Sequence, residues 1–296
     1  MSDLNVLTVL EKISKVWQIQ LNLEYCEKKN NTRMSFKDIG AFCELLATNY
    51  NPDFVGCGSG GMGLDLVNYK TKRSVEVKSC CTIQNAVCKS CGTKFNDLFV
   101  EKCPKCGSSD YKTMKDSRFG IDAKEFLNQF KEGFFENFTM CYISLLKQDK
   151  IAKSITIKME WFKVDFTDKD IKSIQLKYFE NQVEFGRKPH CNLLPYSYDF
   201  YKLCPTKIDE KNIIINYADL NVNPQIINCT FDSKLRVPLE IMPQDKVYQF
   251  KRLKTYSWKN GGSADARDFT LNIDYKEKSL GKERGDTRKK VYDALK

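Results

Sequence analysis

The chain of 296 residues has a single histidine, His190. Chemistry that needs two histidines is therefore excluded, and a Ser/His/Asp hydrolase is not expected. Long apolar runs are also missing, since no stretch approaches the ~20 consecutive apolar residues that span a bilayer. Asp3 and Glu11 lie where a secretory signal needs a basic start and an unbroken apolar stretch. We therefore expect a cytoplasmic protein with no membrane partner.

A Gly-Lys-Ser/Thr phosphate loop is missing as well, although one glycine-rich segment, GCGSGGMG, imitates a nucleotide-binding motif. Its Gly58, Gly60 and Gly63 have the spacing of a dinucleotide-binding fingerprint. That fingerprint follows a strand and opens a helix, whereas these glycines lead into an expected strand. We interpret the segment as a flexible loop at the mouth of a functional site.

Positive charge is in excess, because 48 lysines and arginines stand against 38 acidic residues, a formal net charge of +10. Residues 246–296 hold 14 basic and 7 acidic residues, together with several aromatic side chains. This composition is typical of a surface that binds nucleic acid, although an ordinary solvated face can share it. The candidate DNA-contacting residues are Lys251, Arg252, Lys254, Lys259, Asn260 and Arg267.

Hydrophobic periodicity predicts a mixed α/β domain that ends near residue 165. The expected helices cover residues 4–24, 35–50 and 122–138, and the expected strands cover residues 64–69, 74–79, 139–146 and 153–166. The first two strands flank the basic turn KTKR and should form a hairpin. In residues 166–296 the pattern is weaker, with a helix expected at 165–182 and strands at 212–220 and 236–242.

The hairpin contains the triplet Glu76-Val77-Lys78. Acidic-x-Lys triplets are frequent in this lysine-rich chain, so the triplet alone carries little information. In a strand, however, Glu76 and Lys78 project from the same face. The turn can also bring the carboxylate of Asp65 beside Glu76. Two carboxylates and one ammonium group would then converge, an arrangement that suits Mg²⁺ and a phosphate substrate.

In these features the chain resembles the PD-(D/E)XK nuclease superfamily, and in particular its Type II restriction endonucleases. The matching residues are Glu44 on the helix before the hairpin, Gly63-Leu64-Asp65-Leu66 on its first strand and Val75-Glu76-Val77-Lys78-Ser79 on its second. The resemblance implies a restriction-endonuclease-like α/β core at residues 1–165. The basic region 166–296 would then recognise DNA.

The resemblance also implies Mg²⁺-dependent, sequence-specific hydrolysis of phosphodiester bonds in double-stranded DNA. Asp65, Glu76 and the backbone carbonyl of Val77 would bind the Mg²⁺. Lys78 would serve the attacking water, and Glu44 would be a further ligand or orienting group. Because cutting both strands needs two active centres, a homodimer is expected.

Asp53 is an alternative to Asp65, because Pro52-Asp53 is the literal Pro-Asp of the motif name. We prefer Asp65, which lies within an apolar strand pattern, whereas Asp53 precedes the glycine-rich loop. The other interpretation of the triplet is an ordinary hairpin in which Glu76 and Lys78 form a structural ion pair.

Thirteen cysteines are present, and two pairs among them have the spacing of metal-binding knuckles. The pairs are Cys88-x-x-Cys91-Gly92 and Cys103-Pro104-x-Cys106-Gly107, with eleven residues between them. Four thiolates in this arrangement indicate a closed tetrahedral Zn²⁺ site, whose role is structural. A rubredoxin-type iron centre or a redox pair would use the same residues. We expect a zinc-ribbon insert at residues 86–110, with the neighbouring Cys80 and Cys81 as buried or incidental thiols.

The primary hypothesis from the sequence is therefore a Mg²⁺-dependent Type II restriction endonuclease with a structural zinc ribbon. One alternative is a non-catalytic zinc-ribbon protein that binds DNA. A second is a repair or resolvase nuclease of the same superfamily.

Overall fold

The computed structural model describes most of the chain up to residue 229. The described residues are 3–27, 39–56, 65–82, 86–95, 98–113, 118–131, 133, 135–185, 190–196, 200 and 202–229. Three predictions concern residues outside these ranges: the six candidate DNA-contacting residues between Lys251 and Arg267, residues 57–63 of the glycine-rich segment, and the strand expected at 236–242. The chain divides into two compact units: residues 1–117, 139–161 and 208–231 form the first, and residues 118–138, 162–207 and 232–296 form the second.

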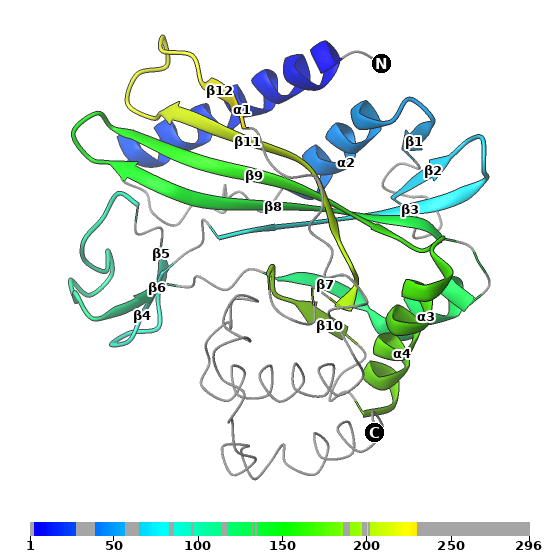
Figure 1. Ribbon diagram of the computed structural model, residues 1–296. Coiled ribbons are helices and arrows are strands. Elements are labelled where there is room, and N and C mark those ends of the chain that lie inside the picture. Colours follow the sequence, from blue (N-terminus) through cyan, green and yellow to red (C-terminus); the bar gives the residue numbers. More distant parts are fainter. Residues whose placement is uncertain are drawn as a thin grey trace. The chain divides into compact units, whose positions relative to one another are not determined.

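A seven-stranded sheet has the strand order β1-β2-β3-β8-β9-β11-β12 (Figure 1). The strands are β1 (Phe54–Gly56), β2 (Leu66–Asn68), β3 (Arg73–Cys81), β8 (Phe135–Asp149), β9 (Ser154–Asp165), β11 (Thr206–Asn216) and β12 (Gln225–Asn228). The β1–β2, β2–β3 and β11–β12 pairs are antiparallel. Neighbouring strands β3 and β8 run in the same direction (Figure 1). The sheet is therefore mixed, and the α/β class predicted from the sequence is confirmed.

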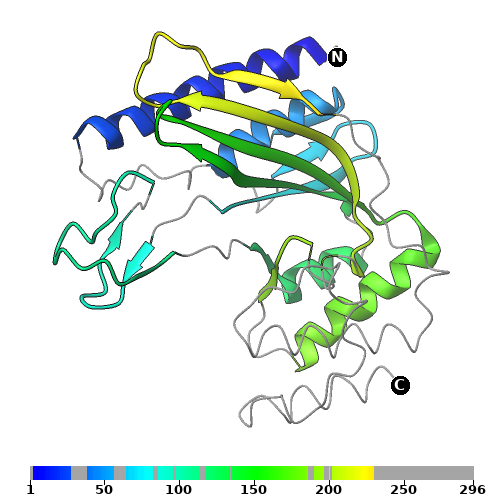
Figure 2. The same cartoon turned by 60° about the vertical axis from the view of Figure 1, so that its left-hand side comes forward.

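Helices α1 (Asp3–Glu27) and α2 (Ile39–Tyr50) cover one face of this sheet (Figure 2). Each buries an apolar stripe in the main core, as their sequence periodicity predicts. Leu10 and Trp17 of α1 and Cys43 of α2 are almost fully buried there, against Ile143 and Ile157 of the sheet. The expected helix at residues 4–24 is confirmed, and α2 confirms the described part of the second expected helix.

Polar side chains of α1 also form hydrogen bonds with the backbone of the turn between β11 and β12. The Gln18 Nε2 group donates to the carbonyl oxygens of Asn216, at 2.7 Å, and Val222, at 2.6 Å. Asn22 Nδ2 donates to the carbonyl oxygen of Tyr217 at 2.9 Å. Because Gln18 is fully buried, these bonds satisfy its amide nitrogen, which would otherwise be costly to bury, whereas its Oε1 atom has no hydrogen-bond partner among the described residues.

The predicted hairpin is confirmed as β2 and β3, with Leu66 opposite Val75 and Asn68 opposite Arg73. The Asn68 carboxamide oxygen accepts hydrogen bonds from the backbone N–H groups of Lys70, at 3.0 Å, and Thr71, at 3.3 Å. The turn therefore fixes the register of β2 against β3, which sets the position of Asp65 relative to Glu76.

The second unit contains β7 (Phe119–Asp122), α3 (Ala123–Lys131), α4 (Lys169–Phe185) and β10 (His190–Leu193). α4 confirms the helix expected at residues 165–182. The helix expected at residues 122–138 is wrong in its second half, because α3 ends at Lys131 and β8 begins at Phe135. Gly133 between them has a positive φ of 72°, a conformation that stops a helix.

The cysteine-rich insert forms a small sheet of its own in the first unit (Figure 1). The strand order of this sheet is β5-β4-β6. Its strands are β4 (Ala86–Cys88), β5 (Lys94–Phe95) and β6 (Tyr111–Thr113). Phe95 is fully buried in a core shared with Cys88 and Cys103, and its ring centroid lies 5.1 Å from that of Tyr111. We call this part of the chain, residues 86–113, the ribbon.

A short segment of the ribbon packs on the main core. Leu98 belongs to the core cluster of the large sheet, and its carbonyl oxygen accepts a hydrogen bond from Gln148 Nε2. The ring of Phe99 lies edge-on to those of Tyr25 and Tyr217, with centroid distances of 5.9 and 4.9 Å. None of the helices that the structure describes has the length and apolar character needed to cross a bilayer.

Candidate active site and metal centre

The two faces of β3 differ in the way that the sequence predicts. Val75 and Val77 are 0% and 6% exposed and belong to the main core beneath α1 and α2. Glu76 and Lys78 are partly exposed on the opposite face. Because successive side chains alternate across a strand, burial of the two valines directs the charged pair away from the helices.

Asp65, directly before β2, completes the group. Its Oδ2 atom accepts a hydrogen bond from the backbone N–H of Val77 at 2.7 Å. The same oxygen lies 3.8 Å from Lys78 Nζ, which also forms an ion pair with Glu76 Oε1. The side chains of Lys78, Asp65 and Glu76 are 28%, 22% and 16% exposed, so the group is accessible to a substrate while its members remain held together.

Electrostatics connect Glu44 of α2 to the same group. Burial raises the pKa of Glu44, the charge of Asp65 raises it further, and Lys78 acts in the opposite direction. Burial by itself would lower the pKa of Lys78, but attraction and hydrogen bonding to Glu76, with attraction to Asp65 and Glu44, raises it overall. Glu44 therefore lies within electrostatic reach of Asp65 and Lys78.

Asp53, the alternative acidic residue, has a different partner. Its Oδ1 atom lies 2.9 Å from Nζ of Lys70, an exposed lysine in the hairpin turn. No ion pair joins Asp53 to Lys78 among the described residues. The geometry favours Asp65 over Asp53 as the partner of Glu76.

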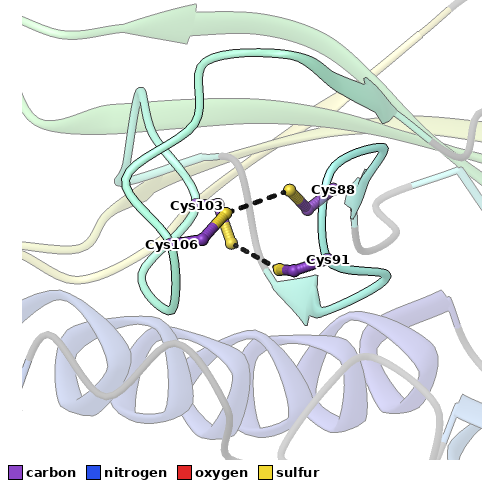
Figure 3. A group of neighbouring side chains, drawn as sticks. All are labelled: Cys88, Cys91, Cys103 and Cys106. Atoms are coloured by element: carbon purple, nitrogen blue, oxygen red, sulfur yellow. Dashed lines mark hydrogen bonds between the residues drawn. The ribbon is translucent and has the colours of Figure 1, made fainter.

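The four knuckle cysteines come together in the ribbon (Figure 3). Their sulfur atoms all lie within 4.8 Å of one another, with Cys88 to Cys106 at 3.5 Å and Cys91 to Cys103 at 3.6 Å. Tetrahedral Zn²⁺ with bonds of about 2.3 Å would hold sulfur atoms about 3.8 Å apart. The donor set therefore fits zinc, and a closed set of thiolates is a poor match for Mg²⁺.

The two knuckles have the same backbone geometry. Gly92 N donates to Cys88 O, and Gly107 N donates to Cys103 O, each at 2.9 Å. The two glycines have positive φ angles of 72° and 71°, a conformation that side chains with a Cβ rarely adopt. The glycine after each pair, visible in the sequence, is thus what lets the chain turn around the sulfur atoms.

Hydrogen bonds from Thr93 favour the thiolate form of Cys91. The Thr93 Oγ1 atom lies 3.2 Å from Cys91 Sγ, and the side chain and backbone of Thr93 lower the pKa of Cys91 to about 6. A backbone hydrogen bond at Ser108 would lower the pKa of Cys106, but hydrogen bonds with the thiols of Cys91 and Cys88 raise it to about 12. The local structure therefore favours the metal-binding thiolate form at Cys91 and not at Cys106. Cys80 and Cys81 are buried and lie outside this group, as expected.

Sequence reasoning missed a second set of charged residues on the sheet. Glu160 of β9 is only 1% exposed, and its Oε1 atom lies 3.1 Å from Lys158 Nζ, which is also 3.9 Å from Glu210 Oε2. Ile157, Met159 and Trp161, which alternate with Lys158 and Glu160 along the strand, are buried in the main core, so the charged pair lies on the other face. The alternation of apolar and charged residues in residues 154–165 was the signal for this arrangement.

Comparison with known families identifies the chain as a restriction endonuclease, a nuclease whose substrate is DNA. Residues 37–245 match the family model described as MamI restriction endonuclease. Because this range is most of the chain, and includes the hairpin and all of the ribbon, the protein belongs to that family. Searches of curated proteins and of solved structures gave no match.

Proposed function

We propose that the protein is a Mg²⁺-dependent Type II restriction endonuclease that hydrolyses phosphodiester bonds of double-stranded DNA at a specific sequence. The observation that carries this proposal is the position of Lys78 Nζ beside carboxylate oxygens of both Glu76 and Asp65. An open group of two carboxylates and one ammonium suits phosphoryl chemistry, and the family assigns DNA as the substrate. Membership of the PD-(D/E)XK superfamily is part of the proposal.

Each residue of the hairpin has a distinct role in this proposal. Asp65, Glu76 and the carbonyl of Val77 would hold Mg²⁺, which supplies charge stabilisation at the scissile phosphate when bound. Lys78 orients the attacking water and neutralises negative charge as it develops on the phosphate. The Val77 N–H group keeps the Asp65 carboxylate aimed at Lys78. Glu44 acts as a further ligand or orients the others from α2.

The four cysteines Cys88, Cys91, Cys103 and Cys106 would bind structural Zn²⁺ and so form a zinc ribbon. Because all four positions of a tetrahedral ion would be filled by sulfur, this site would stabilise the ribbon without taking part in hydrolysis. The sulfur separations and the paired knuckle turns support this role.

Further parts of the proposal concern assembly and recognition. Cutting both strands requires two active centres, so we propose a homodimer. We also propose that residues 166–296 recognise DNA, with Lys251, Arg252, Lys254, Lys259, Asn260 and Arg267 as the candidates for contact. A cytoplasmic location, expected from the sequence, stays a prediction.

Digestion of plasmid DNA with Mg²⁺ or Mn²⁺ tests the proposed activity. Discrete fragments are expected from the parent protein, and Lys78→Ala should cut about 10³-fold more slowly while DNA binding persists. Lys70→Ala is the matched control, because this lysine belongs to the same hairpin but pairs with Asp53. A parent protein that binds DNA but never cuts it would instead favour a non-catalytic zinc-ribbon protein. Cutting of branched or damaged DNA alone would favour a repair or resolvase nuclease.

A further inference from the structure

The small sheet of the ribbon has two unlike faces. Ala86, Cys88 and Phe95 are buried on one side, next to the cysteine cluster. On the other side, Val87 lies directly opposite Lys94 of β5 and directly opposite Lys112 of β6. Because residues opposite each other in antiparallel strands share a face, the register lines up Lys94, Val87 and Lys112 across the sheet.

The positive charge of this face is not cancelled within the described chain. Lys94 and Lys112 are both exposed, and neither forms an ion pair with another described residue. The two acidic residues of the ribbon that the structure describes already have other partners. Asp110 pairs with Lys89 at 2.6 Å, and Glu101 pairs with Lys150 at 3.1 Å.

The spacing of the two lysines suits a polyanion. Adjacent strands are ~4.8 Å apart, so strands β5 and β6 on either side of β4 place the two backbones about 10 Å apart. Long side chains that diverge from these positions can reach separate phosphates of one DNA duplex. Strands β4, β5 and β6 contain no arginine, asparagine or glutamine, the residues best suited to bidentate reading of bases. This chemistry favours contact with phosphates over sequence recognition.

The ribbon is also held firmly to the unit that carries the hairpin. Phe99 packs against both Tyr25 of α1 and Tyr217 after β11, with ring centroids 5.9 and 4.9 Å away, and the two tyrosine rings also contact each other at 5.2 Å. Gln148 of β8 donates to the Leu98 carbonyl oxygen. A charged surface that is packed on the main core can hold DNA in a defined position. The same surface on a flexible linker would attract DNA without orienting it.

We propose that the outer face of the ribbon, formed by Lys94 and Lys112 on either side of Val87, is a DNA-backbone-binding surface that does not read sequence. The inference rests on the proposed function, because it takes the substrate to be duplex DNA. It separates two tasks: the ribbon contributes affinity, and other parts of the chain contribute sequence recognition.

The salt dependence of DNA binding tests this surface. Lys94→Gln/Lys112→Gln removes two charges, and Lys12→Gln/Lys147→Gln removes two exposed lysines outside both the ribbon and residues 166–296 as the matched control. Binding is measured with Ca²⁺ in place of Mg²⁺, and the DNA is checked for integrity afterwards. Two lost phosphate contacts should reduce the slope of log affinity against log salt by about 1.8. Between 50 and 200 mM salt, the parent should then lose about 12-fold more affinity than the ribbon variant.

The control should keep the parent slope, and the ribbon variant should keep its zinc content and its pattern of DNA fragments. An unchanged slope in the ribbon variant, an equal fall in the control, or an altered fragment pattern would overturn the inference. Failure of the proposed function looks different. A Lys78→Ala protein that still cuts refutes the active site but leaves the ribbon surface intact, whereas a parent that binds no DNA refutes both.

Discussion

The hairpin group and the cysteine group differ in how their geometry arises. The cysteine group is made by two nearly identical local turns, each with its own glycine and its own closing hydrogen bond. The hairpin group depends instead on the pairing of two strands, because Asp65 reaches Lys78 only through the register of β2 against β3. A site built from local turns can be identified from the spacing of its residues in the sequence. A site built from strand pairing can be identified only when the pairing of the strands is known.

The two groups also differ in chemistry. The sulfur atoms form a closed set around one point, with three of the four cysteines at least partly buried. The hairpin offers oxygen atoms and one ammonium group, all partly exposed. We infer that the first stabilises the fold and that the second acts on substrate. The variants below are chosen to separate these roles.

Glu76→Gln should have the largest effect on cleavage. The substitution keeps the size of the side chain but removes the charge that pairs with Lys78 and would hold Mg²⁺. We expect the cleavage rate to fall about 10³-fold, or roughly 4 kcal/mol of transition-state stabilisation. The measurement is the initial rate of plasmid cleavage, with Glu11→Gln, an exposed residue of α1, as the control. A rate equal to that of the parent would remove Glu76 from the active site.

Cys106→Ser should act on stability. Loss of one thiolate opens the zinc site, so the protein should lose about one equivalent of metal and roughly 3 kcal/mol of unfolding free energy, because metal binding is coupled to folding. Zinc analysis and denaturant unfolding measure the two quantities. Cys26→Ser, at an exposed cysteine outside the cluster, should change neither. Full zinc retention by Cys106→Ser would contradict the assigned ligand set.

Asp65→Asn and Asp53→Asn decide between the two candidate aspartates. The first should reduce the cleavage rate about 10²-fold, because it weakens one metal ligand while the Val77 hydrogen bond can persist. The second breaks only an ion pair with exposed Lys70, worth about 1 kcal/mol or less. Cleavage rates of the two variants are compared at equal Mg²⁺. The reverse order of effects would transfer the catalytic role to Asp53.

Phe99→Ala tests the attachment of the ribbon, and its effect on stability should be smaller than that of Cys106→Ser. The partly buried ring loses its contacts with Tyr25 and Tyr217, so we expect unfolding to become about 2 kcal/mol easier. Zinc content should stay the same, because no ligand changes. Phe99→Leu, which keeps much of the apolar contact, should lose less. A variant that lost its zinc would show that docking and metal binding are not separable.

The sequence was informative wherever local spacing determines structure. The cysteine knuckles, α1, α4 and the hairpin all follow from periodicity or turn chemistry, and the structure confirms these elements. The helix expected at residues 122–138 was wrong beyond Lys131, because the left-handed turn at Gly133 and burial of Phe135 in β8 override helical spacing.

Contacts between residues far apart in the sequence could not be predicted from local sequence patterns. Nothing in residues 98–101 indicates that Phe99 packs against Tyr25 and Tyr217, which are 74 residues before it and 118 after it. The charged set around Glu160 likewise depends on which strand lies beside β9. The convergence of Asp65, Glu76 and Lys78 was foreseen only because a short turn makes the pairing of β2 and β3 nearly local.

The most direct test measures zinc content and cleavage rate on the same preparation of Lys78→Ala. If the hairpin is the active site and the cysteines are structural, the variant should retain about one equivalent of zinc. It should also bind DNA, and it should cleave about 10³-fold more slowly than the parent. Cleavage at the parent rate would contradict the account, and so would loss of zinc together with activity.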